Sequence, residues 1–198
     1  MSQQSHRIAL ASGCDDNYVM PLAVMLRSAL DHLSADHGID FFLLDGGISS
    51  ASMSKLVRSV DDPRISIHVI PVDLSRFSDL PADGHVTSAA YCRLLLPSLL
   101  PENIGRIIYA DCDMLVCRDL SELNAVPFND HAALAVQDAA APFIDASIVR
   151  EVTGREFGTL AADRPIANYQ SLGLDPSSAY FNSGLMVIDV DVWRTVWM

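Results

Sequence analysis

Three short apolar segments alternate with two amphipathic segments in the first seventy residues, and this order limits the folds open to the chain. The apolar runs Arg7–Ser12, Ile39–Leu44 and Ile65–Ile70 have the length of buried strands, and turn or polar residues follow each of them. Between the runs, apolar residues recur at helical spacing from Leu22 to Leu33 and from Met53 to Val60. The β-α-β-α-β order predicts an α/β fold with a mostly parallel central sheet and helices on both faces.

The rest of the chain continues this pattern. We expect a helix over Thr87–Leu96 that Pro97 disrupts, because proline cannot donate a backbone hydrogen bond inside a helix. Further strands are predicted at Arg106–Ala110, Ala132–Val136 and Tyr180–Ile188, with short helices at Leu120–Leu123 and near Ile144–Val152. The 198 residues are enough for one domain with a sizeable core.

The charge balance excludes several classes of protein. Lys and Arg number 13 against 25 Asp and Glu, so the formal net charge is -12. Such a surface repels phosphate backbones, which argues against nucleic-acid binding and against a polybasic membrane binder. No apolar run approaches the roughly 18 residues of a transmembrane helix. The four cysteines, Cys14, Cys92, Cys112 and Cys117, lack zinc-site spacing, which favours reduced thiols and a cytoplasmic protein.

The triplet Asp111-Cys112-Asp113 is the strongest candidate for a metal site. Among 21 aspartates chance alone gives about two Asp-x-Asp triplets, and the chain has a second one at Asp189 and Asp191. Position separates them, because Asp111 follows an apolar strand and ligands bind at the carboxyl ends of strands in open α/β sheets. Residues i and i+2 of an extended chain share a direction, so both carboxylates could hold one Mn²⁺ or Mg²⁺. The alternative is a solvated turn, whereas Asp189 is better explained as a helix N-cap.

Other polar residues have two readings each. Asp15 and Asn17 follow the first strand and would either bind a base or ribose or form an ordinary Asx turn. Arg93 is either an anion contact or a surface residue of its helix. The chain has no G-x-G-x-x-G or Walker A sequence, and its only lysine is Lys55.

With these pieces placed, the chain resembles glycosyltransferase family 8, a retaining group of GT-A fold. The resemblance covers nearly the whole chain and depends on five motifs in order and spacing. They are Cys14-Asp-Asp-Asn-Tyr18, Phe42-Leu-Leu-Asp-Gly-Gly-Ile-Ser49, Tyr91-Cys-Arg-Leu94, Ile108-Tyr-Ala-Asp-Cys-Asp-Met-Leu115 and Tyr180-Phe-Asn-Ser-Gly-Leu185.

The resemblance implies transfer of a hexose, with retention, from a UDP-sugar to a glycan or lipopolysaccharide-type acceptor, with Mn²⁺ or Mg²⁺ as cofactor. Residues 1–198 would then form a single, partial nucleotide-sugar-binding domain. Asp111 and Asp113 match the metal-binding pair, and both belong to the donor-binding set. Asp15 and Asn17 match the uridine-binding turn, Arg93 matches an arginine near the diphosphate, and Asp138 and Asn182 match sugar-contacting positions. No catalytic nucleophile is assigned.

The chain also departs from the family. Members run to about 300 residues and supply a third metal ligand from a distal histidine motif that is absent here. We therefore expect a C-terminally truncated chain with weak UDP binding and little transfer. An apolar end at Trp193 to Met198 predicts docking or self-association.

Two other functions stay open. The chain could be a non-catalytic remnant or a partner-binding module of the same fold, which the apolar end favours. It could also be a phosphohydrolase of the haloacid-dehalogenase type, in which the first aspartate of Asp-x-Asp is a nucleophile. In that class the triplet normally follows the first strand, whereas here it lies at position 111.

Overall fold

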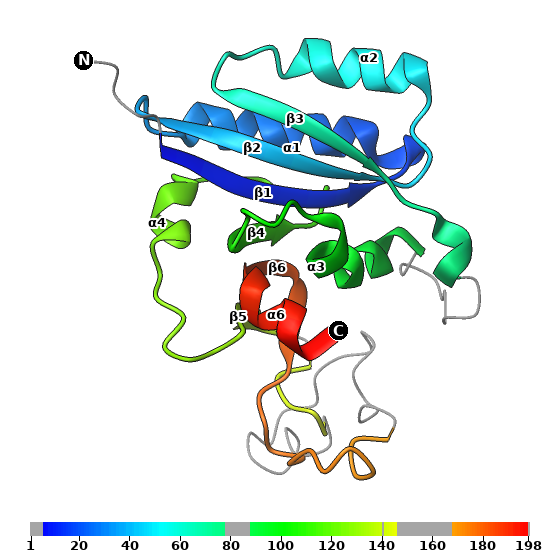
Figure 1. The fold of residues 1–198 in the computed structure, drawn as a ribbon, viewed down its shortest axis with the longest axis vertical. Coiled ribbons are helices and arrows are strands. Elements are labelled where there is room, and N and C mark those ends of the chain that lie inside the picture. The colour runs from blue at the N-terminus through cyan, green and yellow to red at the C-terminus, as the bar shows by residue number, and fades with distance from the viewer. Residues whose placement is uncertain (1–5, 78–87, 140, 146–167, 198) are drawn as a thin grey trace. The chain divides into compact units, whose positions relative to one another are not determined.

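The computed structural model describes residues 6–77, 88–139, 141–145 and 168–197 (Figure 1). The strands are β1 (His6–Cys14), β2 (His37–Asp45), β3 (Ile65–Pro71), β4 (Arg106–Ala110), β5 (Ala133–Gln137) and β6 (Phe181–Asp189). The α-helices are α1 (Val19–His32), α2 (Ser50–Ser59), α3 (Leu96–Leu99), α4 (Leu120–Asn124) and α6 (Val190–Trp197). Three 3₁₀ helices, η1 (Asp16–Tyr18), η2 (Leu74–Phe77) and η3 (Ser88–Leu95), complete the described elements.

The six strands form one sheet in the order β3-β2-β1-β4-β6-β5. β1 lies between β2 and β4 and runs parallel to both, and β2 runs parallel to β3. Parallel strands need crossover connections, which α1 and α2 provide. The α/β fold expected from the alternating apolar and amphipathic segments is therefore confirmed.

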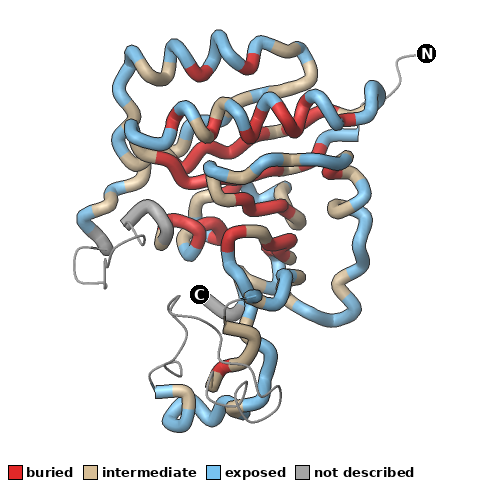
Figure 2. The backbone as a smooth tube through the Cα atoms, turned by 180° about the vertical axis from the view of Figure 1, so that it is seen from behind, coloured by how far each residue is buried: buried red, intermediate tan, exposed pale blue. Residues whose placement is uncertain are grey.

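The central strands β1, β2 and β4 are largely buried on both faces, as expected for parallel strands covered by helices, whereas β3 and β5 have no buried residue. Buried residues concentrate on the strands and on α1 (Figure 2). One face contributes a core cluster that includes Ala11, Phe42 and Tyr109, together with Leu96 of α3. Neighbouring strand residues such as Leu10 and Phe41, both fully buried, alternate to the other face.

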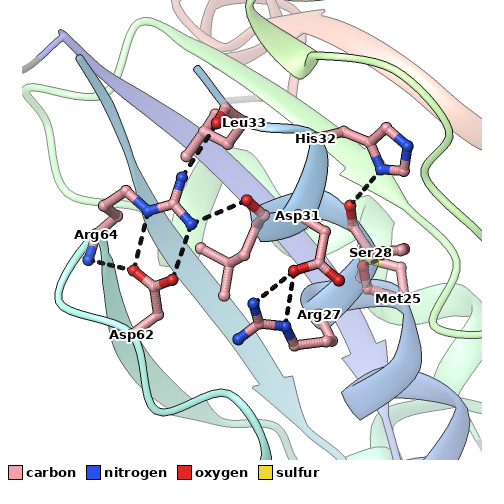
Figure 3. Close-up of polar contacts among 9 residues, drawn as sticks. Met25, Arg27, Ser28, Asp31, His32, Leu33, Asp62 and Arg64 are labelled. Carbon is pink, nitrogen blue, oxygen red and sulfur yellow. Dashed lines mark hydrogen bonds and ion pairs between the residues drawn. The ribbon is translucent and has the colours of Figure 1, made fainter. Parts of the chain in front are cut away.

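Hydrogen-bonding side chains mark the ends of the first two helices. Ser49 caps α2, because its hydroxyl accepts from the Ser52 N–H at 3.2 Å. Arg64 closes the C-terminal end of α1, since its guanidinium donates to the Leu30 and Leu33 carbonyls at 2.9 and 3.1 Å (Figure 3). Asp62 holds that guanidinium in an ion pair of 2.8 Å, and its hydrogen bonds to Arg64 lower the pKa of Asp62 to about 2.

The segment around Pro97 differs from the prediction. Instead of one helix ended by the proline, the chain forms η3 and then α3, with Pro97 in the first turn of α3. The first turn of a helix leaves its N–H groups unpaired, so the missing donor of proline costs little there. Pro97 thus begins a helix and does not disrupt one.

The last strand leads directly into α6. The carboxylate of Asp189 accepts from the Val192 N–H at 3.0 Å, which confirms that this aspartate is a helix cap. Trp193 packs against the core cluster. Arg194 donates to the carbonyls of Leu100 and Pro101, beyond the end of α3, at 3.1 and 2.9 Å. Part of the apolar end is therefore docked on the body of the fold.

The chain divides into two compact units, residues 1–134 with 186–198, and residues 135–185. Of the helix expected near Ile144–Val152, residues 146–152 lie outside the described residues, and Ile144 lies in a bend, where its N–H donates to the Ser178 carbonyl at 3.0 Å. In the described part of the chain, no helix has the length and apolar character that a membrane crossing requires.

Candidate active site

The carboxyl ends of β1, β2 and β4 meet at one edge of the sheet, because these strands are parallel neighbours. Asp15 and Asn17 follow β1, Asp45 ends β2, and Asp111 follows β4. This is the edge at which open α/β sheets bind ligands. The sequence-predicted residues of the first unit thus gather where a site is expected.

Asp111 is held by two neighbours on the buried side. Its Oδ1 accepts from Arg93 at 2.8 Å and from the Tyr109 hydroxyl at 3.1 Å. The Arg93 side chain is only 10% exposed, and its guanidinium lies 4.6 Å from the centre of the Tyr109 ring. A charge buried to this degree needs a partner, and Asp111 supplies it. Arg93 is therefore part of the site and not a surface residue.

Tyr109 is a site residue that the sequence analysis did not assign. Its ring is 1% exposed, and burial raises the pKa of its phenol above the ordinary value. Burial thus favours the protonated phenol, whose hydroxyl donates to Asp111. The i, i+2 spacing of Tyr109 and Asp111 on an extended chain was the available signal.

The two carboxylates of the triplet differ in their surroundings. The Asp111 side chain is 35% exposed, and Asp113 is an exposed residue of the following turn. Among the described residues, the bonds from Arg93 and Tyr109 both end on Oδ1 of Asp111, and Asp113 makes no hydrogen bond or ion pair. Oδ2 of Asp111 and the carboxylate of Asp113 are hard oxygen donors of the kind that Mn²⁺ and Mg²⁺ prefer.

These donors fit an open cation site with two protein ligands. No group of three or more His, Cys, Asp or Glu residues suited to a metal ion occurs in the ranges that the structure describes. The remaining coordination positions would go to a ligand or to water. Mg²⁺ is commonly bound in this way, by one or two carboxylates together with substrate phosphates.

The turn after β1 is an Asx turn. The Asp15 carboxylate accepts from the Asn17 N–H at 2.9 Å, and the Asn17 side chain is exposed. The next carboxylate, Asp16, accepts from the Ser49 N–H at 2.8 Å, and this hydrogen bond lowers the pKa of Asp16. Asp16 thus joins the turn to the start of α2.

Two cysteines lie beside this edge. Cys14 ends β1 and is buried, whereas Cys112, between the two aspartates, is partly exposed. Contact with the Cys112 thiol and burial together raise the pKa of Cys14. Both thiols are free, and their contact was not foreseen from their spacing in the sequence.

Asp138 and Asn182 belong to the second unit, where they contact each other. The Asn182 amide donates to Asp138 at 3.2 Å, and its Oδ1 accepts from the Gly184 N–H at 2.8 Å. Asp138 also accepts from the Ala141 N–H at 2.9 Å. These bonds fix two polar side chains next to each other within residues 135–185.

Open α/β sheets bind ligands at the carboxyl edge, where this chain places carboxylates and a buried arginine. The family model of glycosyl transferase family 8 matches residues 9–196, so the chain belongs to that family. The family resemblance noted from the five motifs is confirmed.

Known relatives share sequence along nearly the whole chain. General stress protein A of Bacillus subtilis is 28% identical over 186 residues, which are 93% of this chain and 57% of that protein. The lipopolysaccharide 1,2-glucosyltransferase of Escherichia coli is 23% identical over 190 residues, 96% of this chain and 49% of the enzyme. The chain thus spans about half the length of these curated relatives.

Solved structures agree on the fold. The crystal structure of the galactosyltransferase LgtC in complex with donor and acceptor sugar analogues superposes with a TM-score of 0.72 at 24% identity. That match covers 95% of this chain and 60% of LgtC. The expected GT-A fold is therefore confirmed.

Proposed function

We propose that this chain is the nucleotide-sugar-binding part of a metal-dependent glycosyltransferase. It would transfer a hexose, with retention, from a UDP-sugar to a glycan or lipopolysaccharide-type acceptor. The observation that carries this proposal is the Asp111 and Asp113 pair at the carboxyl end of β4, beside the Asp15–Asn17 turn at the end of β1. Membership of the family and its likeness to hexosyltransferases support the choice of reaction.

The chemistry of the donor explains why an acidic protein would need this site. A nucleoside diphosphate is an anion, and two carboxylates alone would repel it. Asp111 and Asp113 would hold a divalent cation, which would supply the positive charge that a departing diphosphate needs.

The chain's own residues would then orient the donor. Tyr109 and Arg93 hold Asp111 through Oδ1, which directs Oδ2 to the cation side. The Arg93 guanidinium adds positive charge near the diphosphate. The exposed Asn17 side chain and the Asp15 turn would bind the uridine. Asp138 and Asn182 are proposed as sugar contacts on the family resemblance alone. One carboxylate oxygen of Asp15 accepts from the Asn17 N–H, so the second oxygen would accept from a ribose hydroxyl.

Selective nucleotide binding tests this proposal. The equilibrium affinities of UDP, UDP-glucose, GDP and ADP are compared in the presence of Mn²⁺. We expect the two uridine nucleotides to bind and the purine nucleotides to bind at least tenfold more weakly, because a turn that hydrogen-bonds one base leaves polar groups unpaired with another. Equal affinity for all four nucleotides, or no binding at all, would contradict the proposal.

Transfer by the 198-residue chain alone should be slow, because two carboxylates are the only protein ligands proposed for the cation. UDP release from UDP-hexoses in Mn²⁺ measures it. Turnover at the rate of a full-length relative would refute this expectation of impaired activity.

A further inference from the structure

Two cysteines lie beyond or at the ends of neighbouring strands, at the proposed metal site. β1 and β4 run parallel, with Leu10 opposite Ile108 and Ala11 opposite Tyr109. Cys14 is the last residue of β1, and Cys112 lies two residues beyond the end of β4. The two cysteines are therefore at the same edge of the sheet, on adjacent strand ends.

The Cys14 and Cys112 thiols contact each other, and both are free. The Cys14 thiol also donates to the Asp15 carbonyl at 3.1 Å. Formation of a disulfide therefore needs no large movement of the backbone.

We propose that Cys14 and Cys112 form a reversible disulfide that switches off the metal-binding triplet. The first part stands on the adjacent strand ends and the thiol contact, and the effect on the site rests on the proposed function. The two remaining cysteines differ, because Cys92 is buried and Cys117 is exposed on the surface.

The chemistry balances as a thiol–disulfide exchange with a small organic disulfide, RSSR. Cys112 is the more accessible thiol, so its sulfur attacks RSSR, forms a mixed disulfide and releases one RSH. The Cys14 sulfur then attacks the Cys112 sulfur, forms the Cys14–Cys112 bond and releases the second RSH. Two protein thiols are oxidised and one RSSR is reduced to two RSH.

The cross-link would move the triplet and not the central strand. Cys14 is held by the β1–β2 ladder, and its carbonyl accepts from the Gly46 N–H at 2.9 Å. Cys112 lies in a turn beyond the end of β4. A sulfur–sulfur bond is about 2.05 Å long, much shorter than a contact between two thiols, so Cys112 must approach Cys14. Asp111 and Asp113 flank Cys112 and shift with it, which disturbs the bonds of Asp111 to Arg93 and Tyr109.

The test uses cystamine, a cationic disulfide that this acidic chain does not repel. Free thiols are titrated and disulfides are mapped by peptide mass spectrometry before and after treatment. We expect a Cys14–Cys112 disulfide in the unmodified chain and in Cys117→Ser, and none in Cys112→Ser or Cys14→Ser. A mixed disulfide at Cys117 as the only product, or a different pair, would overturn the proposal.

Calorimetric titration of UDP with Mn²⁺ then measures the effect on the site. Oxidation should weaken binding by about 10-fold to 100-fold, as displacement of groups that orient a metal ligand does, and dithiothreitol should restore it. Unchanged affinity in a chain shown to hold the disulfide would overturn the switch. If the reduced chain does not bind UDP, the proposed function fails, and the disulfide map still decides whether the thiol pair forms.

Discussion

Replacing Tyr109 with phenylalanine tests whether the buried tyrosine holds Asp111, one of the two carboxylates of the proposed metal site. The substitution removes one hydroxyl and keeps the ring on which Arg93 stacks. The lost bond joins a neutral donor to a carboxylate at 3.1 Å, and such bonds contribute about 1.5–3 kcal/mol. Asp111 is 35% exposed and keeps Arg93, so water can replace part of the loss. We therefore expect the free energy of unfolding to fall by about 1.5 kcal/mol.

A double-mutant cycle measured by urea unfolding separates this bond from other effects of the substitution. Tyr109→Phe is compared in the unmodified chain and in an Asp111→Ala background, where the acceptor is absent. The cost should be smaller in that background, with a coupling of about 1 kcal/mol, because the two residues are in direct contact. Changes that add within about 0.3 kcal/mol would refute the claim that Tyr109 acts through Asp111.

Three further predictions concern the framework around the site. Arg194→Ala should lower the free energy of unfolding by about 2–3 kcal/mol in a urea titration, because it leaves the carbonyls beyond α3 without their charged donor. Asp191→Ala removes only an exposed partner of Arg194, so it should change the free energy of unfolding little in the same titration. The Asp62 carboxylate has a lowered pKa, so its contribution to the free energy of unfolding is present above pH 3.8 and is lost as the pH falls toward about 2. Asp62→Asn should therefore flatten the acid limb of a stability–pH profile, and an unchanged profile would contradict this. Gly47→Ala should lower the free energy of unfolding by about 1–3 kcal/mol through backbone strain alone, because φ is 111° and nothing lies within 4 Å of the added Cβ. An unchanged stability in thermal unfolding would contradict this and show that the turn relaxes.

Local sequence patterns predicted most of the framework. The apolar runs and helical spacings located β1 to β4, α1 and α2, and the cap at Asp189 followed from its side-chain chemistry. These features depend on neighbours in the sequence. The segment before Pro97 was harder, because its helical spacing does not distinguish a 3₁₀ helix from an α-helix.

Contacts between residues far apart in the sequence could not be predicted from local patterns. The placement of Asp111 at the edge of the sheet followed from its position after an apolar strand. The pairing of Arg93 with Asp111 required knowledge of how η3 packs on the sheet. The contact of Cys14 with Cys112 required the pairing of β1 with β4, two strands that are not consecutive in the chain.

The central claim is that Asp111 and Asp113 hold a divalent cation that receives a uridine nucleotide. Calorimetric titration of UDP into the purified chain, with and without Mn²⁺, tests it most directly when Asp111→Ala is measured beside Asp191→Ala. Asp191 belongs to the other Asp-x-Asp triplet and is 70% exposed, so it is a matched control. We predict Mn²⁺-dependent binding that Asp111→Ala abolishes and Asp191→Ala preserves. Binding that is independent of Mn²⁺, or that survives in Asp111→Ala, would contradict the account.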